Sequence, residues 1–367
     1  MAILLISAII YWEEGVDKKM RTFNYARLRD QKWNTDLLGL IAAIYKEAGK
    51  QEMFFKHQPA KTEKLVEIAR IHSTEASNAI EGIRTTSTRL RQLVLDQTTP
   101  MNRDEQEIVG YRDALLLIHE NYDAIPITRN YILQLHKILY SHMNNPAAGR
   151  TKTAQNYINA TYSNGQTVTL FTPLAPYETP NALDALCATY NLTIGNFMVD
   201  PLLIIPIFIH DFLCIHPFND GNGRMSRLLT TLLLYQNGFF VGKYISLEAQ
   251  IATRKNSYYK SLRDSQEGWH EGKEDILPFM KYLLGTILSA YKDLDNRMTL
   301  IGENRSALEI VKMACQQKNG RFTKQDIRDF CPTLSISSVE GALRKMVISG
   351  ELSKEGKGKN TRYRRMF

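Results

Sequence analysis

Apolar residues recur at three- and four-residue steps along most of this chain, and this helical period constrains the fold more than any other feature. The pattern starts near residue 36, where Leu37, Ile41 and Ile44 would share one face of a helix. It returns between Ile108 and Ile118 and again, further on, over roughly 246–264 and 274–300. The sequence therefore predicts a mainly α fold.

The stretch between Thr153 and Thr172 lacks this helical period. A helix is expected from Ile127-Thr128 through His142, after which Thr, Tyr, Val and Phe cluster between Thr153 and Thr172. Asn164-Gly165 lies inside this cluster, and both residues tolerate the positive φ that a tight turn requires. We expect a small β-hairpin here, followed by a return to helix near Glu178.

The charge of the chain is concentrated at its C-terminal end. Of 46 Lys+Arg and 38 Asp+Glu, 14 and 6 fall in residues 305–367, which leaves 32 of each in the first 304 residues. The same segment predicts three helices, around Leu308-Met313, Thr323-Phe330 and Ser335-Ser349, and then a basic Gly-rich hairpin. This order resembles a winged helix-turn-helix.

Other features exclude several classes of protein. The four cysteines lack the spacing of a zinc site and the density of a disulfide framework. The apolar residues 1–10 have no basic leader and are too short to span a bilayer, so we expect a strand or packing arm. The apolar run Leu202–Ile215 contains Pro206 and Asp211 and predicts a helix buried in a large core. These features favour a cytoplasmic protein without a membrane partner.

The segment from His216 to Arg227 carries the chemistry. Backbone N–H groups at Gly221, Asn222 and Gly223 would open a helix, where small side chains and the positive end of the helix dipole suit an anion such as phosphate. Arg224 and Arg227 are three residues apart, so they share a helix face and could hold separate phosphates.

Two flanking side chains complete this picture. The carboxylate of Asp220 is the hard oxygen ligand that a phosphate-bound Mg²⁺ prefers. His216 titrates near neutrality and could accept a proton from an attacking hydroxyl.

Phe218 is expected to point inward and anchor the loop. The remaining histidines, including His72, His136 and His210, are expected to be structural or solvated.

The string His-Pro-Phe-Asn-Asp-Gly-Asn-Gly-Arg-Met-Ser-Arg resembles the signature of the Fic family, His-x-Phe-x-(Asp/Glu)-Gly-Asn-Gly-Arg-x-x-Arg, at every defined position. The wider similarity runs from about residue 60 to 290. It implies a Fic-type helical core with a small β-hairpin flap, which transfers AMP from ATP to a Ser, Thr or Tyr hydroxyl of a target protein.

The resemblance also implies a role for each residue of the motif. His216 would be the catalytic base, Asp220 would bind Mg²⁺, and Asn222 with the glycines would hold the α-phosphate region. Arg224 and Arg227 would contact the β- and γ-phosphates. Outside the motif, the hairpin near Val168–Thr172 would be the flap that aligns the target, and Tyr259 would line the adenine pocket.

A second motif predicts that this activity is restrained. Ser77-Asn78-Ala79-Ile80-Glu81-Gly82 resembles the inhibitory motif of Fic proteins, (Ser/Thr)-x-x-x-Glu-(Gly/Asn), on a helix ahead of the catalytic core. Glu81 would then pair with Arg227, remove the partner of the γ-phosphate and repel the nucleotide. We expect a protein that rests nearly inactive.

The sequence leaves two other functions open. The C-terminal segment could make the chain a DNA-binding transcriptional regulator, or it could bind a protein. Alternatively, Glu81 could orient a water that removes AMP from modified targets. Self-modification, a homodimer and the identity of the target are also left open.

The predicted organisation has three parts. Residues 1–100 form an N-terminal helical region that carries the inhibitory helix, residues 101–300 form the Fic catalytic core, and residues 305–367 form a winged-helix-like basic domain.

Overall fold

The computed structural model describes residues 21–57, 59–161, 165–196, 199–302, 305–318, 320–331 and 334–366. The apolar N-terminal segment, for which a strand or packing arm was expected, lies outside these ranges.

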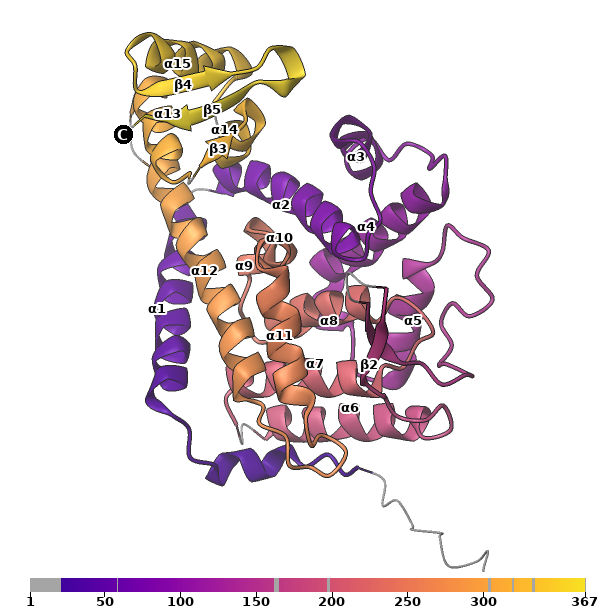
Figure 1. The fold of residues 1–367 in the computed structure, drawn as a ribbon. Helices are drawn as coiled ribbons and strands as arrows, with labels where there is room; N and C mark the ends of the chain where they lie inside the picture. The colour runs from indigo at the N-terminus through magenta and orange to yellow at the C-terminus, as the bar shows by residue number, and fades with distance from the viewer. Residues whose placement is uncertain are drawn as a thin grey trace, which may run out of the picture.

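The described chain is mainly helical, as predicted (Figure 1). Up to residue 302 the α-helices are α1 (Thr35–His57), α2 (Pro59–Ile80), α3 (Ser87–Val94), α4 (Arg103–Asn121), α5 (Arg129–Leu139), α6 (Thr179–Gly195), α7 (Pro201–Ile215), α8 (Asn222–Gln236), α9 (Val241–Tyr244), α10 (Leu247–Thr253), α11 (Lys255–Gln266) and α12 (Leu277–Gly302). Short 3₁₀ turns occur at Tyr25–Asp30 and Tyr122–Ala124.

Side-chain caps explain where several of these helices begin. Thr86, Asn102, Thr128, Asp200 and Ser246 each stand one residue before a helix and accept a hydrogen bond from a backbone N–H of its first turn. Such caps satisfy donors that have no partner inside the helix.

Two expected helices end differently from the prediction. The helix expected to reach His142 ends at Leu139, because Tyr140 leaves the helical conformation at φ −112° and ψ 14°. The helix expected over 246–264 is two helices, α10 and α11, since Arg254 between them has φ −121° and ψ 34°. The side chain of Arg254 bonds to Ser289 Oγ on α12 at 3.0 Å.

The predicted hairpin is present. Strands β1 (Ile158–Thr161) and β2 (Thr167–Phe171) pair antiparallel, with Ala160 opposite Val168. Gly165 in the connection has φ +82°, which a residue without Cβ adopts without strain, while Asn164 lies outside the described residues.

Helix α7 lies at the centre of the fold. Every residue from Leu202 to Ile215 is buried, which confirms the predicted core helix. The carboxylate of Asp211 inside this core accepts hydrogen bonds from Tyr25 Oη and Trp269 Nε1, each at 2.7 Å, and pairs with Arg21 at 3.3 Å.

Within the described ranges, no helix combines the length and apolarity needed to cross a membrane.

The N-terminal helices share this core. Leu37 and Ile44 of α1 and Leu65 of α2 belong to the same buried cluster as α7 and α8. The division at residue 100 remains a prediction about the sequence.

The C-terminal unit, residues 305–366, has a core of its own. It contains α13 (Ala307–Gln316), β3 (Arg321–Phe322), α14 (Lys324–Phe330), α15 (Ile336–Ile348), β4 (Leu352–Glu355) and β5 (Arg362–Arg365). The strands form an antiparallel sheet in the order β3-β5-β4. This unit sits at the end of α12, beside the N-terminal part of α2 (Figure 1). Three helices and a basic hairpin are therefore present, and their function as a winged helix remains a prediction.

Candidate active site

The loop between α7 and α8 begins with His216 in the left-handed conformation, at φ 50° and ψ 62°. This backbone conformation is unfavourable for a residue with a Cβ, so the surrounding structure must hold it in place. Phe218, two residues later, is fully buried and anchors the loop as expected.

Two side chains that precede the hairpin brace this loop. Asn156 donates from Nδ2 to the carbonyl of His216 at 3.2 Å and to that of Phe218 at 3.0 Å. The ammonium of Lys152 donates to the carbonyl of Ile215 at 3.0 Å and to Asn156 Oδ1 at 2.8 Å. Burial lowers the pKa of Lys152 to about 8. Lys152 was not among the predicted site residues, because an isolated lysine belongs to no recognisable motif.

His136 on α5 supports the other side of the loop. Its Nδ1 accepts a hydrogen bond from Gly149 N at 3.0 Å, and its Nε2 lies 3.1 Å from the carbonyl oxygen of Asp220. The ring stacks on Phe218 with centroids 3.7 Å apart. Burial lowers the pKa of His136 to about 4, so the neutral ring donates from Nε2 to Asp220. His136 is structural, as expected, but it acts directly on the loop.

The surroundings of His216 favour one neutral form of its imidazole. Its Nδ1 lies 3.2 Å from the carbonyl oxygen of Leu213, which fixes the proton on Nδ1 and leaves the lone pair on Nε2. Burial lowers the pKa of His216 to about 4, so the imidazole carries no charge at pH 7. An uncharged imidazole can accept a proton from a hydroxyl.

Glycines at the start of α8 leave room for other groups. Gly221 has φ +83°, and a Cβ there would lie 3.0 Å from Tyr140 Oη. A Cβ on Gly223 would lie 2.4 Å from Glu81 Oε1. The carboxylate of Glu81 therefore stands directly over the first turn of α8, where the helix N–H groups favour an anion.

Arg227 on α8 contacts the end of α2 and the turn that follows it. Its Nε donates to Ser77 Oγ at 2.8 Å, and its Nη2 donates to the carbonyl of Ser77 at 2.9 Å and to Glu81 Oε1 at 2.8 Å. The Arg227 side chain is 3% exposed and that of Glu81 is 33% exposed. The pair expected from the sequence is thus in contact, with one side open to solvent.

Arg224 lies in a different environment from Arg227. Its side chain is 1% exposed, with Nη1 2.8 Å from Glu107 Oε2 of α4 and Nη2 donating to Tyr140 Oη at 2.8 Å. In this arrangement the guanidinium of Arg224 faces the interior, and its contact with a β-phosphate remains a prediction. Glu107 was missed, since no local pattern links it to a residue on α8.

Two more residues of the motif differ in what they offer. The Asn222 side chain is buried and exchanges hydrogen bonds with the backbone of Phe218, from N at 2.9 Å and to O at 2.7 Å, so only its backbone N–H can meet an anion. The carboxylate of Asp220 is 63% exposed, and its Oδ1 accepts from Gly221 N at 2.6 Å. The backbone N–H groups at the start of α8, with the space around Gly223, form what we call the anion seat. A largely exposed carboxylate beside it fits a Mg²⁺ that keeps several waters and also binds phosphate.

Tyr259 lies on α11 and is 45% exposed, whereas its neighbour Tyr258 is buried. The ammonium of Lys255 stands 5.7 Å from the centre of the Tyr259 ring. Burial, and then the charge of Glu81, raises the pKa of Tyr259 to about 12. Tyr259 thus offers an accessible aromatic face near Glu81, which suits the predicted adenine contact.

The hairpin offers exposed edges to a partner. Val168 and Leu170 of β2 are 37% and 39% exposed, while Phe171 is buried against His270. His270 Nε2 also lies 2.9 Å from the carbonyl of Thr172, which ties the end of the hairpin to the segment after α11.

These features define a helical protein with an anion seat at a helix start and a neutral histidine beside it. Residues 126–234 match the family model described as Fic/DOC family, and the chain therefore contains a Fic/DOC-family domain.

Curated relatives are similar over about half of this chain. Protein adenylyltransferase fic-1 of Caenorhabditis elegans is 28% identical over 186 residues, which are 49% of this chain and 32% of the relative. Protein adenylyltransferase Fic of Nematostella vectensis is 24% identical over 212 residues, which are 56% of this chain and 44% of the relative. The matched part is thus less than half the length of these relatives.

Solved structures share the fold over more of the chain. A Fic family protein from Desulfovibrio desulfuricans G20 aligns with a TM-score of 0.58 and 19% identity, over 92% of this chain and 97% of that one. A Fic-domain-containing signaling protein from Bacteroides thetaiotaomicron VPI-5482 aligns with a TM-score of 0.59 and 20% identity, over 71% of this chain and 98% of that one.

Proposed function

We propose that this chain is a protein adenylyltransferase that moves AMP from ATP to a Ser, Thr or Tyr hydroxyl of a target protein. The observation that carries the proposal is the neutral His216 next to the glycine-lined start of α8. A base and an anion seat at one loop are two parts that assist attack of a hydroxyl on the phosphoanhydride of ATP. The names of the curated relatives support the same reaction.

The proposed reaction forms one bond and breaks another at the α-phosphorus of ATP. The target hydroxyl oxygen bonds to the α-phosphorus of ATP, its proton passes to His216 Nε2, and the bond from the α-phosphorus to the bridging oxygen breaks, which releases pyrophosphate. Backbone N–H groups at Asn222 and Gly223 bind the phosphate oxygens, whereas the N–H of Gly221 already donates to Asp220 Oδ1. Asp220 would hold Mg²⁺, which supplies positive charge to the phosphates.

We also propose that Glu81 keeps this activity low. Its carboxylate stands over Gly223 and accepts a hydrogen bond from Arg227 at 2.8 Å, so it takes the space and the guanidinium that a nucleotide phosphate would use. A nucleotide phosphate placed beside Gly223 would also be repelled by the negative charge of Glu81. ATP would then bind in a pose that does not favour in-line attack.

Labelling with radioactive ATP tests both proposals. We expect Glu81→Gly to raise self-labelling or target labelling in the presence of Mg²⁺ by at least about tenfold over wild type. A hydrogen bond to a charged group contributes about 1.5–3 kcal/mol, and the inhibited state loses this contribution when Glu81 is removed. The double variant Glu81→Gly with His216→Ala is the control, and it should lose the signal. Labelling that survives the loss of His216 would contradict its role as base.

Removal of AMP is the second candidate, because the partly exposed Glu81 carboxylate could orient a water at the same seat. Wild type and Glu81→Gly are each mixed with labelled target in the absence of ATP. Release of AMP by wild type alone would favour this reaction. A stable label in both mixtures would leave transfer as the function.

A further inference from the structure

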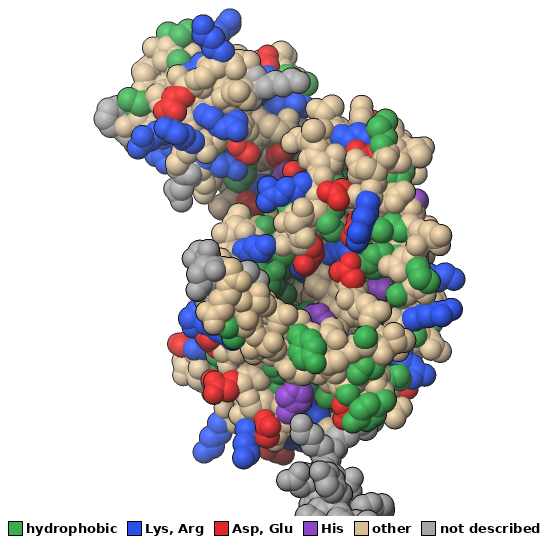
Figure 2. Space-filling view, turned by 45° about the vertical axis from the view of Figure 1, so that its right-hand side comes forward, with side chains coloured by type: hydrophobic (Ala, Val, Ile, Leu, Met, Phe, Trp, Pro, Cys, Tyr) green, Lys and Arg blue, Asp and Glu red, His purple; other side chains and the backbone are tan. Residues whose placement is uncertain are grey.

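The C-terminal unit and the helical core are packed separately. Among the described residues, the buried apolar side chains of the C-terminal unit form a cluster apart from that of the helical core. Figure 2 shows the unit as the smaller upper part of the molecule, with charged side chains where it meets the larger body. Parts of a chain that meet through polar contacts are expected to move relative to each other. A side chain that bridges the two parts can transmit such a movement.

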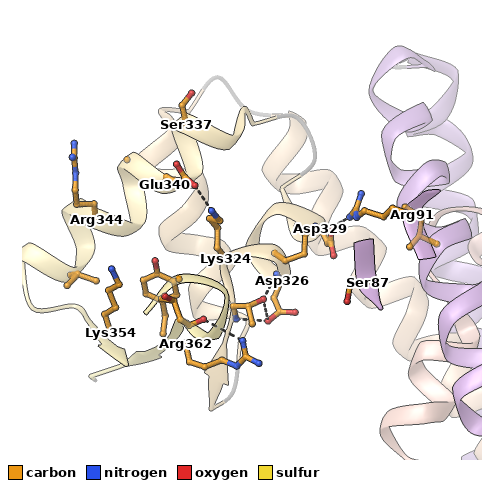
Figure 3. A pocket seen from close by; sticks show the side chains of 18 of the residues that line it. Ser87, Arg91, Lys324, Asp326, Asp329, Ser337, Glu340, Arg344, Lys354 and Arg362 are labelled. Carbon is orange, nitrogen blue, oxygen red and sulfur yellow. Dashed lines mark hydrogen bonds and ion pairs between the residues drawn. The ribbon is translucent and has the colours of Figure 1, made fainter. Parts of the chain in front are cut away.

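Asp329, in the last turn of α14, makes this bridge. Its Oδ2 accepts a hydrogen bond from His72 Nε2 of α2 at 3.0 Å, and its Oδ1 accepts one from Arg91 Nη2 of α3 at 3.1 Å. Figure 3 shows Asp329 and Arg91 pointing toward each other from α14 and α3. Burial disfavours the charge of Asp329, but the contacts with His72, Gln325 and Arg91 outweigh burial and leave its pKa below the ordinary value. The carboxylate thus holds its partners in the charged form.

The two helices that Asp329 contacts flank Glu81 in the sequence. Helix α2 ends at Ile80 and α3 begins at Ser87. Residues 81–86 connect the two helices, and we call them the Glu81 turn. One carboxylate of the C-terminal unit therefore ties together both helices from which this turn extends.

The Glu81 turn is rigidly joined to these helices. Gly82, at φ +87°, donates from its backbone N to the carbonyl of Ala79 at 3.1 Å. Ile83 N donates to the carbonyl of Asn78 at 3.0 Å. These two bonds form a Schellman motif, which fixes the turn to the end of α2. The Ile83 side chain packs against a small apolar cluster that α2, α3 and α4 share. A displacement of α2 or α3 is therefore passed on to Glu81.

The turn also has space beside it. A cleft of about 480 Å³ is lined by Ala79 of α2, by Ile83 and Thr85 of the turn, and by Ala252 of α10. A Cβ on Gly82 would have no described atom within 4 Å. Part of the turn can therefore shift without displacing a packed side chain.

We infer that the C-terminal unit restrains the Glu81 turn through Asp329, and so sets how firmly Glu81 is held over Gly223. With the contacts of Asp329 in place, α2 and α3 are fixed relative to each other and the carboxylate of Glu81 stays beside Arg227. When the C-terminal unit shifts, both helices lose this restraint, and the turn samples positions in which the bond from Arg227 to Glu81 is broken. The effect on catalysis rests on the proposed inhibition, whereas the restraint itself does not.

The restraint is expected to be modest. The side chains of His72 and Arg91 are 30% and 34% exposed, and ion pairs of this kind are weak. Arg89 of α3 also pairs with Glu105 of α4 at 2.9 Å, so α3 stays attached to the core when the contact with Asp329 is lost. We therefore expect the turn to loosen and not to detach.

Hydrogen exchange of the full chain without ATP tests the restraint. We expect Asp329→Ala to raise exchange in residues 81–94 about two- to fivefold over wild type, because local opening of these residues becomes easier once the ion pairs are lost. Exchange in α8 should stay unchanged, since this helix is buried in the core. Unchanged exchange in residues 81–94 would overturn the inference.

Two further variants separate this contact from other effects of the substitution. Arg91→Gln removes the same ion pair from the α3 side and leaves the C-terminal unit intact, so it should also raise exchange in the Glu81 turn. Combined with Asp329→Ala, it should add no further increase, since both changes remove one shared pair. An additive increase would mean that the two residues act separately, which would overturn the inference.

Glu351→Ala is the matched control. It also removes a carboxylate from the C-terminal unit, but Glu351 pairs with Lys312 of the same unit at 2.8 Å. Exchange in residues 81–94 should match that of wild type. An equal rise in Glu351→Ala and Asp329→Ala would show a general effect of lost charge and overturn the role of Asp329.

Labelling with ATP and Mg²⁺ tests the consequence for Glu81. We expect otherwise wild-type protein with Asp329→Ala to label about two- to threefold faster than Glu351→Ala. If Glu81→Gly is active and Asp329→Ala labels no faster than wild type, regulation by the C-terminal unit is overturned while the transfer reaction stands. If Glu81→Gly gives no labelling, the proposed function fails, and the exchange measurements still decide whether the restraint exists.

Discussion

The loop between α7 and α8 and the C-terminal unit are both attached to the same helical core, but by different kinds of contact. The loop is fixed by buried hydrogen bonds from Asn156, Lys152 and His136. The C-terminal unit is tied to α2 and α3 by Asp329, whose partners His72 and Arg91 have side chains that are 30% and 34% exposed. Buried networks are costly to disturb, while exposed ion pairs contribute little and exchange readily with water or ligand. One region is therefore built to stay fixed and the other to be adjusted.

The largest expected difference between the two regions is in stability. Glu107→Ala leaves the buried guanidinium of Arg224 without its carboxylate, and we expect the free energy of unfolding to fall by about 3–5 kcal/mol. Glu351→Ala removes an exposed pair of the C-terminal unit and should cost less than about 1 kcal/mol. Urea denaturation of both variants measures this. Similar losses in both would contradict the contrast.

The next effect concerns Lys152, which supports the loop between α7 and α8. In the Glu81→Gly background, Lys152→Met removes the ammonium that holds the carbonyl of Ile215, and we expect the labelling rate to fall about tenfold. The KM for ATP should change little, because Lys152 acts on the loop rather than on the nucleotide seat. A rise in KM at constant kcat would show that Lys152 touches the nucleotide instead. Urea denaturation of the same variant separates this effect from unfolding.

The pH dependence of labelling tests the environment of His216. Its pKa is lowered to about 4, so the neutral base is present above this value and is lost only as the pH falls through it. We expect the Glu81→Gly variant to keep its labelling rate between pH 8 and pH 6. An unperturbed histidine would lose about fourfold over this range. A fourfold loss at pH 6 would therefore show that His216 is more hydrated than the structure indicates.

The smallest expected effect links the two regions. Asp329→Ala should raise labelling by otherwise wild-type protein about two- to threefold, since a partly exposed ion pair contributes about 1 kcal/mol or less. The same substitution should change nothing in the Glu81→Gly background, where the inhibitory carboxylate is already absent. An equal increase in both backgrounds would mean that Asp329 acts by another route than Glu81.

Local patterns predicted much of the fold. The apolar run Leu202–Ile215 predicted the buried α7, and Asn164-Gly165 with its β-branched and aromatic neighbours predicted the hairpin. The breaks at Tyr140 and Arg254 were not predicted, because both residues are compatible with a helix. Their conformation is set by what surrounds them, such as the contact of Arg254 with α12.

The sequence by itself determined which chemical groups are available: the histidine, the glycines at a helix start, the two arginines and the glutamate upstream. Those follow from residue types at short spacing. Only the tertiary structure decided that Arg224 turns inward to Glu107, that Lys152 and His136 hold the loop, and that Asp329 of α14 meets His72 of α2. The physical reason is that these partners are far apart along the chain, so their meeting depends on how whole helices pack and not on any local pattern.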